Sequence, residues 1–274
     1  MKPIYNTDLA CENLNIDENY NCLEEDLGYC TIIRQNDIFQ CVTVFCDKLN
    51  ILDEYSLNLI SLTISEELTK IIESIFEGRD KKELSYLIIG LGNSDFTADS
   101  IGPRTVSKLS PTRHLNTSDN TLPLISIFSP SVLSKSGIET VDIVRSISNK
   151  IAPDLIIAID SLSARSCDRL GTTIQISSNG IAPGSGVRNA RSAINEETVG
   201  IPVIAIGVPT VVDSATLVLD TLEKANFQDI NDSLFSVLRE SKTFFVTPKE
   251  CDELTEASAK LISRAINGAL EIIS

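Results

Sequence analysis

The sequence has a single histidine, no tryptophan and few aromatic residues, which make up 5% of its 274 positions. One histidine is too few for an HExxH zinc site, and the patterns GxxxxGK(S/T) and GxSxG, which mark P-loop enzymes and serine hydrolases, are absent. The seven cysteines form no CxxC pair, so neither a zinc knuckle nor a thioredoxin-like site is indicated. We therefore expect a core of isoleucine, leucine and valine, and no metal or other cofactor.

Basic residues are outnumbered, because 23 lysines and arginines face 38 aspartates and glutamates, which gives a net charge of −15. A surface that binds nucleic acid must be basic to displace counterions, so direct nucleic-acid binding is disfavoured. No apolar run approaches the ~20 residues of a membrane span, and the first eight residues lack the apolar centre of a signal peptide. The sequence thus predicts a cytoplasmic protein with reduced thiols that does not bind a membrane.

Two regions differ in composition. Residues 1–27 are polar and acidic, and we expect them to form a loosely held arm or propeptide. Residues 28–274 are expected to form a single α/β domain. At its start, the β-rich runs 29–34 and 38–45 predict a hairpin, and apolar residues spaced by three and four over 53–76 predict a helix. We expect this hairpin and helix to be an appendage to the domain.

From residue 84 onward, strands and helices alternate. The pattern predicts strands over 84–91, 122–128, 154–159, 172–176 and 202–208. It predicts helices over 101–109, 138–151 and 213–225, and a last helix after residue 247. Capping boxes are expected at Ser136/Glu139 and Thr247/Glu250. Three strands hold continuous apolar runs, which are typical of a mostly parallel sheet with helices on both faces.

Sites in such sheets form outside the carboxyl ends of the strands, which selects residues 90–103, 159–166 and 207–213. The first segment does not match the GxGxxG motif of dinucleotide-binding proteins, because Asp95 stands where the third glycine is needed. Asp99 and Asp160 remain, and each has a plain alternative role as a helix or turn cap. Brought together, two carboxylates could share a proton, one activating water and the other polarising a carbonyl. His114 follows a predicted helix, away from the strand ends, and favours a surface role.

Several stretches, taken in order, match a known family. They are Gly90-Leu91-Gly92-Asn93, Thr97-Ala98-Asp99-Ser100-Ile101-Gly102-Pro103, Thr112-Arg113-His114-Leu115, Ser136-Gly137-Ile138-Glu139-Thr140, 153–166, 172–177, Pro183-Gly184-Ser185-Gly186, 200–213 and Val246-Thr247-Pro248-Lys249-Glu250. Together they cover most of residues 84–250. Through them the chain resembles the spore germination protease family of endospore-forming bacteria. The resemblance is specific, although Ala98 stands where the family usually has proline and the connection over 226–243 looks shorter.

The resemblance implies an aspartic-type endopeptidase, unrelated to pepsin, that degrades the small acid-soluble proteins coating spore DNA. It also implies a self-processing zymogen and a homotetramer in the forespore or spore core. It places the two catalytic aspartates on Asp99 and Asp160. The residues we name as candidates for substrate binding are Asn93, Gly184, Gly186, Gly207 and Thr210.

The N-terminal arm contains a candidate processing site. The family's substrates resemble a threonine or serine and an acidic residue, followed by an apolar residue and alanine, and Thr7-Asp8-Leu9-Ala10 repeats that order. Because proteolysis concentrates in mobile termini, we expect self-cleavage between Asp8 and Leu9. The alternative is a coincidental tetrapeptide that packs as ordinary structure.

Other functions stay open at this point. The pattern Gly-Leu-Gly-Asn…Ala-Asp-Ser-Ile-Gly also resembles hydrogenase maturation proteases, whose fold, a phosphorylase-like one, is the fold we expect here. Those enzymes use carboxylates and histidine around nickel, and the sheet core here offers no histidine. A divalent-metal peptidase could use the same two aspartates as oxygen ligands. An inactive relative that only binds its partner is the non-enzymatic alternative.

Overall fold

The apolar runs of the sequence form the centre of one mixed β-sheet in the computed structural model, which describes residues 6–13, 22–36, 40–115, 122–184, 191–227, 232–240 and 244–272. Four strands run parallel in the order β8-β6-β4-β5. They are β4 (Ser85–Gly90), β5 (Leu124–Phe128), β6 (Leu155–Ala164) and β8 (Val203–Asp213). Successive side chains of these strands point to opposite faces of the sheet. Because both faces are covered, consecutive residues are buried, which explains the continuous apolar runs.

The other half of the sheet is antiparallel. β7 (Thr173–Ser177) pairs with β8, and β3 (Gln40–Phe45), β2 (Thr31–Asn36) and β1 (Cys22–Asp26) follow beside it. A short strand, β9 (Phe245–Val246), also pairs antiparallel with β8. The predicted hairpin is therefore present, but it extends the main sheet instead of forming an appendage.

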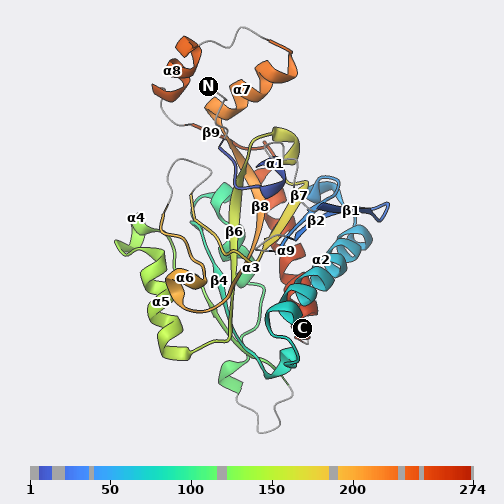
Figure 1. Cartoon of the computed structure of the whole chain (residues 1–274), viewed down its shortest axis with the longest axis vertical. Coiled ribbons are helices and arrows are strands. Elements are labelled where there is room, and N and C mark those ends of the chain that lie inside the picture. The colour runs from blue at the N-terminus through green and yellow to red at the C-terminus, as the bar shows by residue number, and fades with distance from the viewer. Residues whose placement is uncertain are drawn as a thin grey trace.

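Helices cover both faces of the sheet (Figure 1). One face packs against α2 (Glu54–Ile75), α3 (Ile101–Val106) and α9 (Cys251–Ala269). The other packs against α5 (Thr140–Ile151) and α6 (Glu196–Val199). Alternate residues of β4 divide between the two cores, since Ile88 belongs to the first and Leu87 and Ile89 to the second. The predicted α/β fold with helices on both faces is confirmed, but the sheet is mixed and not mostly parallel, because β7, β3, β2 and β1 join it by antiparallel pairing.

The remaining helices lie at the ends of the sheet. They are α1 (Ala10–Asn13), α4 (Leu133–Ser136), α7 (Ser214–Lys224) and α8 (Asp232–Glu240). In Figure 1, α7 and α8 stand at the top, beyond the carboxyl end of β8. No helix within the described ranges combines the length and apolar character needed to cross a membrane.

Two predicted strand ends were placed too early. β6 continues through Asp160 to Ala164, and β8 continues through Thr210 to Asp213. The two strands stay paired across a register shift at Leu162/Ser163, opposite Pro209, where a missing N–H is tolerated. Asp160 and Gly207 thus lie inside strands and not in loops after them, which holds their main chain fixed.

Both predicted capping boxes are wrong. Ser136 ends α4, and its hydroxyl accepts a hydrogen bond from the N–H of Ile138, so it is engaged in a turn. Glu139 is the N-cap of α5 but makes no side-chain cap bond. The last helix begins at Cys251, with Glu250 as an N-cap that also makes no side-chain cap bond, so Pro248 precedes the helix.

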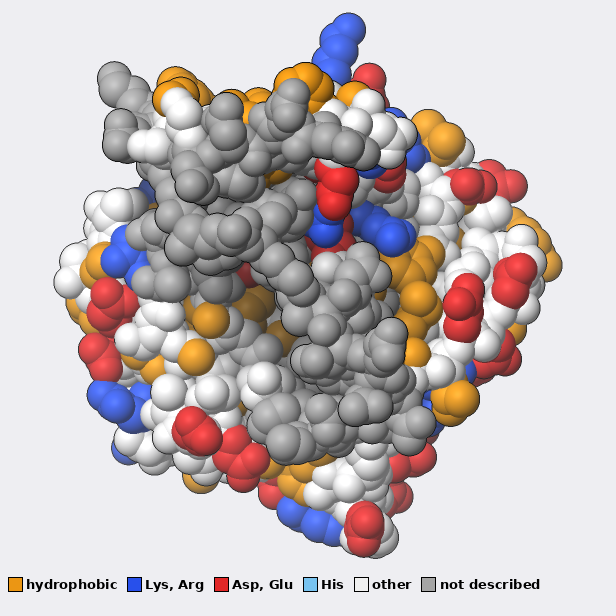
Figure 2. Space-filling view, turned by 45° about the horizontal axis from the view of Figure 1, so that its top comes forward, with side chains coloured by type: hydrophobic (Ala, Val, Ile, Leu, Met, Phe, Trp, Pro, Cys, Tyr) orange, Lys and Arg blue, Asp and Glu red, His pale blue; other side chains and the backbone are white. Residues whose placement is uncertain are grey.

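Acidic side chains are spread over the described part of the face shown in Figure 2, in keeping with the net charge of −15. The same view shows apolar side chains exposed between them. Among the large exposed apolar side chains are Phe244 and Phe245 at the start of β9 and Phe227 after α7.

Candidate active site

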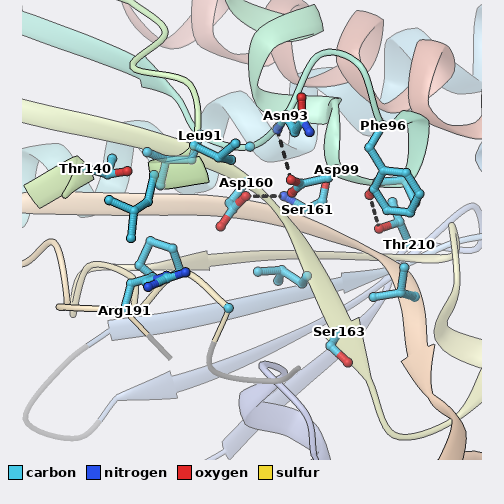
Figure 3. Close-up of a pocket in the computed structure, with 18 of the residues that line it drawn as sticks. Leu91, Asn93, Phe96, Asp99, Thr140, Asp160, Ser161, Ser163, Arg191 and Thr210 are labelled. Carbon is cyan, nitrogen blue, oxygen red and sulfur yellow. Dashed lines mark hydrogen bonds between the residues drawn. The ribbon is translucent and has the colours of Figure 1, made fainter. Parts of the chain in front are cut away.

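A pocket of about 360 Å³ opens at the carboxyl end of β4, beside β6 and β8 (Figure 3). Asp99 and Asp160 both line it, so the structure brings together the two acids that the sequence singled out. They lie next to one another in Figure 3, and the charge of Asp99 acts on Asp160. Their placement follows from register, because β4 ends at Gly90, which pairs with Ile159 of β6, so Asp160 lies just beyond the carboxyl end of β4.

Asp99 sits at the end of a single 3₁₀ turn, Thr97–Asp99, that follows β4. Its carboxylate accepts a hydrogen bond from the N–H of Asn93 at 2.9 Å. It is not a helix cap, since Ser100 is the N-cap of α3. Burial raises the pKa of Asp99 to about 6, and the Asn93 N–H opposes that rise by stabilising the charged form.

Glycine lets this turn approach the sheet. Gly92 has φ of 108°, and a Cβ there would lie 2.1 Å from the carbonyl oxygen of Asp99. A Cβ on Gly102 would lie 2.2 Å from the carbonyl oxygen of Leu91 and 2.6 Å from that of Ile159. The Gly-Leu-Gly-Asn stretch and Gly102 therefore keep Asp99 against the ends of β4 and β6.

Asp160 is 5% exposed, and its Oδ1 accepts a hydrogen bond from the N–H of Ser161 at 2.8 Å. Burial raises the pKa of Asp160 well above its ordinary value, and the negative charges of Asp99 and Asp8 raise it further. Both effects favour the protonated form of the Asp160 carboxyl. The pair offers one acid and one base, as general acid–base chemistry requires.

The other predicted site residues divide into three groups. Asn93, Gly184 and Thr210 line the pocket. Gly207 does not line it, and a Cβ there would lie 2.5 Å from Cγ of Leu162, so this glycine makes room for that side chain. Gly186 lies outside the described residues. His114 is exposed in a 3₁₀ turn before β5, away from the pocket, as predicted.

Thr210 contacts the 3₁₀ turn that carries Asp99 directly. Its buried hydroxyl donates a hydrogen bond to the carbonyl oxygen of Ala98 at 2.6 Å, which ties the Asp99 turn to β8. The side chain therefore positions Asp99, and a contact between Thr210 and substrate stays a prediction.

The N-terminal segment, residues 6–13, is bound at this site and is not loosely held. Asp8 lines the pocket, and its carboxylate accepts a hydrogen bond from the N–H of Ser163 at 2.8 Å. Leu9 is fully buried. The Glu12 carboxylate accepts the N–H groups of Arg165 at 2.6 Å and Ser166 at 3.1 Å. Sequence reasoning missed these partners because most of them act through the main chain, which leaves no side-chain signal.

The charge of the pocket lining is acidic. Asp8, Asp99, Glu139 and Asp160 line it, and Arg191 is the one basic residue among the described lining residues. Nη1 of Arg191 lies 3.8 Å from Oε1 of Glu139. Within the described ranges, no three His, Cys, Asp or Glu side chains are grouped as a metal ion would need.

The sequence of this chain is similar to those of known proteins. A family model described as "Germination protease" matches residues 38–228. The chain belongs to the germination protease family. That membership makes it a peptidase of spore germination. Germination proteases from Caldanaerobacter subterraneus subsp. tengcongensis and Clostridium acetobutylicum are 40% and 38% identical to it. The alignments cover 77% and 84% of this chain and 74% and 78% of those proteins.

Two further similarities are narrower. The germination protease of Bacillus subtilis is 45% identical over 60% of this chain and 45% of its own length. A [NiFe] hydrogenase maturation protease from Thermococcus kodakarensis aligns in structure with a TM-score of 0.34 and 17% identity, over 72% of this chain and 99% of that one. A structural similarity of that size does not establish a shared fold.

We expect Thr210→Val to lower kcat/KM for peptide cleavage by about 10- to 100-fold, because the Asp99 turn loses its bond to β8. The variant should also lose about 1–3 kcal/mol of unfolding free energy, since the buried Ala98 carbonyl is left unpaired. The matched control is Thr221→Val, whose exposed hydroxyl bonds the Leu217 carbonyl within α7. Steady-state kinetics and urea unfolding measure both effects. Equal results for the two variants would contradict a positioning role for Thr210.

Proposed function

We propose that the chain is an aspartic-type endopeptidase that hydrolyses small acid-soluble spore proteins in the forespore or spore core. The observation that carries the proposal is the pairing of Asp99 and Asp160 in one pocket, in a member of the germination protease family. Asp99 is the base that takes a proton from water. Asp160 is the acid that donates a hydrogen bond to the carbonyl oxygen of the scissile peptide.

We further propose that the chain is made as a zymogen that cleaves itself between Asp8 and Leu9, and that it works as a homotetramer. The bound N-terminal segment supports the first part, because Asp8 lines the pocket that holds Asp160. The arm was expected to be cleaved because it is mobile. Its firm binding gives a different reason, since the segment already lies where a substrate chain would lie. The tetramer follows from family resemblance alone.

The direct test is incubation of the purified protein with a small acid-soluble spore protein, with cuts mapped by mass spectrometry. We expect cleavage after an acidic residue and before an apolar one, and undiminished cleavage in EDTA. Loss of cleavage in EDTA, restored by a divalent cation, would favour a metal peptidase with the same carboxylates. Absence of any cut by the mature chain would favour an inactive binding relative.

The pH profile tests the two roles separately. We expect kcat/KM to rise as Asp99 loses its proton, with a midpoint near its pKa of about 6. It should fall at higher pH, where Asp160 ionises, because the raised pKa of Asp160 delays that ionisation. Initial rates from about pH 4 to pH 9 with one peptide give the profile. A profile that is flat through about pH 5 to 7 would contradict the role of Asp99.

A further inference from the structure

Residues 7–10 lie against the sheet and form main-chain hydrogen bonds with it, as a bound peptide would. The N–H of Asp8 donates to the carbonyl oxygen of Ser163 at 2.9 Å, and the N–H of Ser163 donates to Oδ2 of Asp8 at 2.8 Å. The Leu9 side chain lies in a closed apolar pocket with Leu162, Leu170 and Val212. This segment is thus held by its main chain, with one apolar side chain buried.

Gln175 makes two of the contacts that hold this segment. Its Nε2 donates to the carbonyl oxygen of Asp8 at 3.1 Å, and its Oε1 accepts the N–H of Ala10 at 2.7 Å. A primary amide carries both donors and an acceptor, so one side chain holds the main chain on both sides of Leu9. Both contacts are to main-chain atoms. They are therefore open to any peptide whose main chain follows the same path, whatever its side chains.

Sheet register places Gln175 relative to the catalytic acids. Asp160 on β6 pairs with Gly207 on β8, and Gly207 pairs with Gln175 on β7. Residues in register on adjacent strands project from the same face, and two strand spacings put Asp160 and Gln175 about 10 Å apart. Between them Gly207 has no side chain, and the side chain of Leu162 fills that space as a floor. A peptide strand passing over this floor has an acid on one side and an amide on the other.

We propose that Gln175 is a substrate-positioning residue of this peptidase. Its amide holds the main chain of the substrate around the residue that follows the acidic one, and the pocket of Leu162, Leu170 and Val212 takes that residue's apolar side chain once the chain's own Leu9 has left it. The inference rests on the proposed function, because it assumes that the N-terminal segment follows the path of a substrate.

A backbone-modified peptide tests this role without relying on the loss of activity alone. The substrate is a copy of residues 6–13 with serine in place of Cys11, made once with alanine and once with N-methylalanine at the position of Ala10. N-methylation removes the donor that faces Oε1 of Gln175. We expect it to lower kcat/KM about tenfold in the wild-type chain and less than twofold in Gln175→Ala.

The matched control is Gln40→Ala. Gln40 lies on β3 of the same sheet, accepts one hydrogen bond from the Ser74 hydroxyl and does not line the pocket. It should show the full tenfold effect of N-methylation. An equal effect in all three proteins would overturn the proposal.

Hydrogen exchange of the intact chain gives a readout that needs no cleavage. The Ala10 amide should exchange at least about tenfold faster in Gln175→Ala than in the wild type. It should stay protected in Gln175→Glu, which keeps an acceptor oxygen in either protonation state. Unchanged protection in Gln175→Ala would overturn the proposal. If the exchange result holds but the wild type cleaves no peptide, the proposed function fails while main-chain binding by Gln175 stands.

Discussion

Replacing Asp160 by asparagine is expected to lower kcat/KM for cleavage of a small acid-soluble spore protein by a factor of about 10² to 10⁴. Asparagine keeps the shape of the side chain and can accept the hydrogen bond from the N–H of Ser161. It has no acidic proton to place on the scissile carbonyl. Steady-state rates on one defined protein substrate measure the loss. The matched control is Asp168→Asn, an exposed aspartate outside the pocket that pairs with Lys224 at 2.8 Å.

The same variant should not be destabilised at neutral pH. Because the pKa of Asp160 is raised in the folded chain, its stabilising contribution is full below the unfolded pKa of about 3.9 and is lost as pH rises through the folded pKa. Asparagine never ionises and escapes that loss. We expect Tm of Asp160→Asn to exceed that of the wild type increasingly as pH rises above about 4. Near-normal turnover would remove Asp160 from the mechanism, and a collapse of Tm would make the rate loss uninformative.

Purified full-length chain, held at about pH 6, is expected to yield a mature form that begins at Leu9. At that pH Asp99 is partly ionised, since its pKa is about 6, and burial favours the protonated form of Asp160. The Asp8 carbonyl already lies at the site, held by Gln175. The rate should be first order and independent of protein concentration, because each chain carries its own segment. Intact mass and N-terminal sequencing follow the reaction.

Two variants sharpen this prediction. Asp160→Asn should keep its original N-terminus. Leu9→Lys should slow processing at least about tenfold, because a charged side chain cannot enter the closed pocket that Leu9 fills. Its control is Leu23→Lys on β1, where the leucine is 63% exposed. A form still starting at Met1, or equal cleavage in the Asp160→Asn chain, would refute self-processing.

Local patterns in the sequence predicted where most strands lie, but not how far they extend. Continuous apolar runs located β4, β6 and β8, because strands buried on both faces need apolar residues at every position. β6 and β8 extend beyond these runs, where small and polar residues such as Ser161 and Ser163 replace the apolar ones. The place of the hairpin in the sheet depends on pairing between β3 and β7, which no local pattern records.

The site was only partly accessible to the same reasoning. Asp99 and Asp160 stood out because carboxylates follow, or interrupt, apolar strands, and burying such a group needs a reason. Gln175 gave no comparable signal, since a polar residue on β7 fits an ordinary half-exposed strand. Its importance arises from register across β7, β8 and β6, and from a segment some 165 residues earlier in the chain that lies against it.

The pairing of β3 with β7 also orders events during synthesis. Cys41 pairs with Ser177, so the N-terminal hairpin leaves the ribosome about 130 residues before its partner strand exists. Until then one edge of β3 is unpaired. Its residues Val42 and Val44 belong to the core of the folded protein. The part of the sheet that carries Gln175 is complete only after β8, which pairs with β7, has been synthesised as well. The surface that holds residues 7–10 is thus completed later in synthesis than the two acids beside it, because Gln175 and its partner strand β8 both follow Asp99 and Asp160 in the chain.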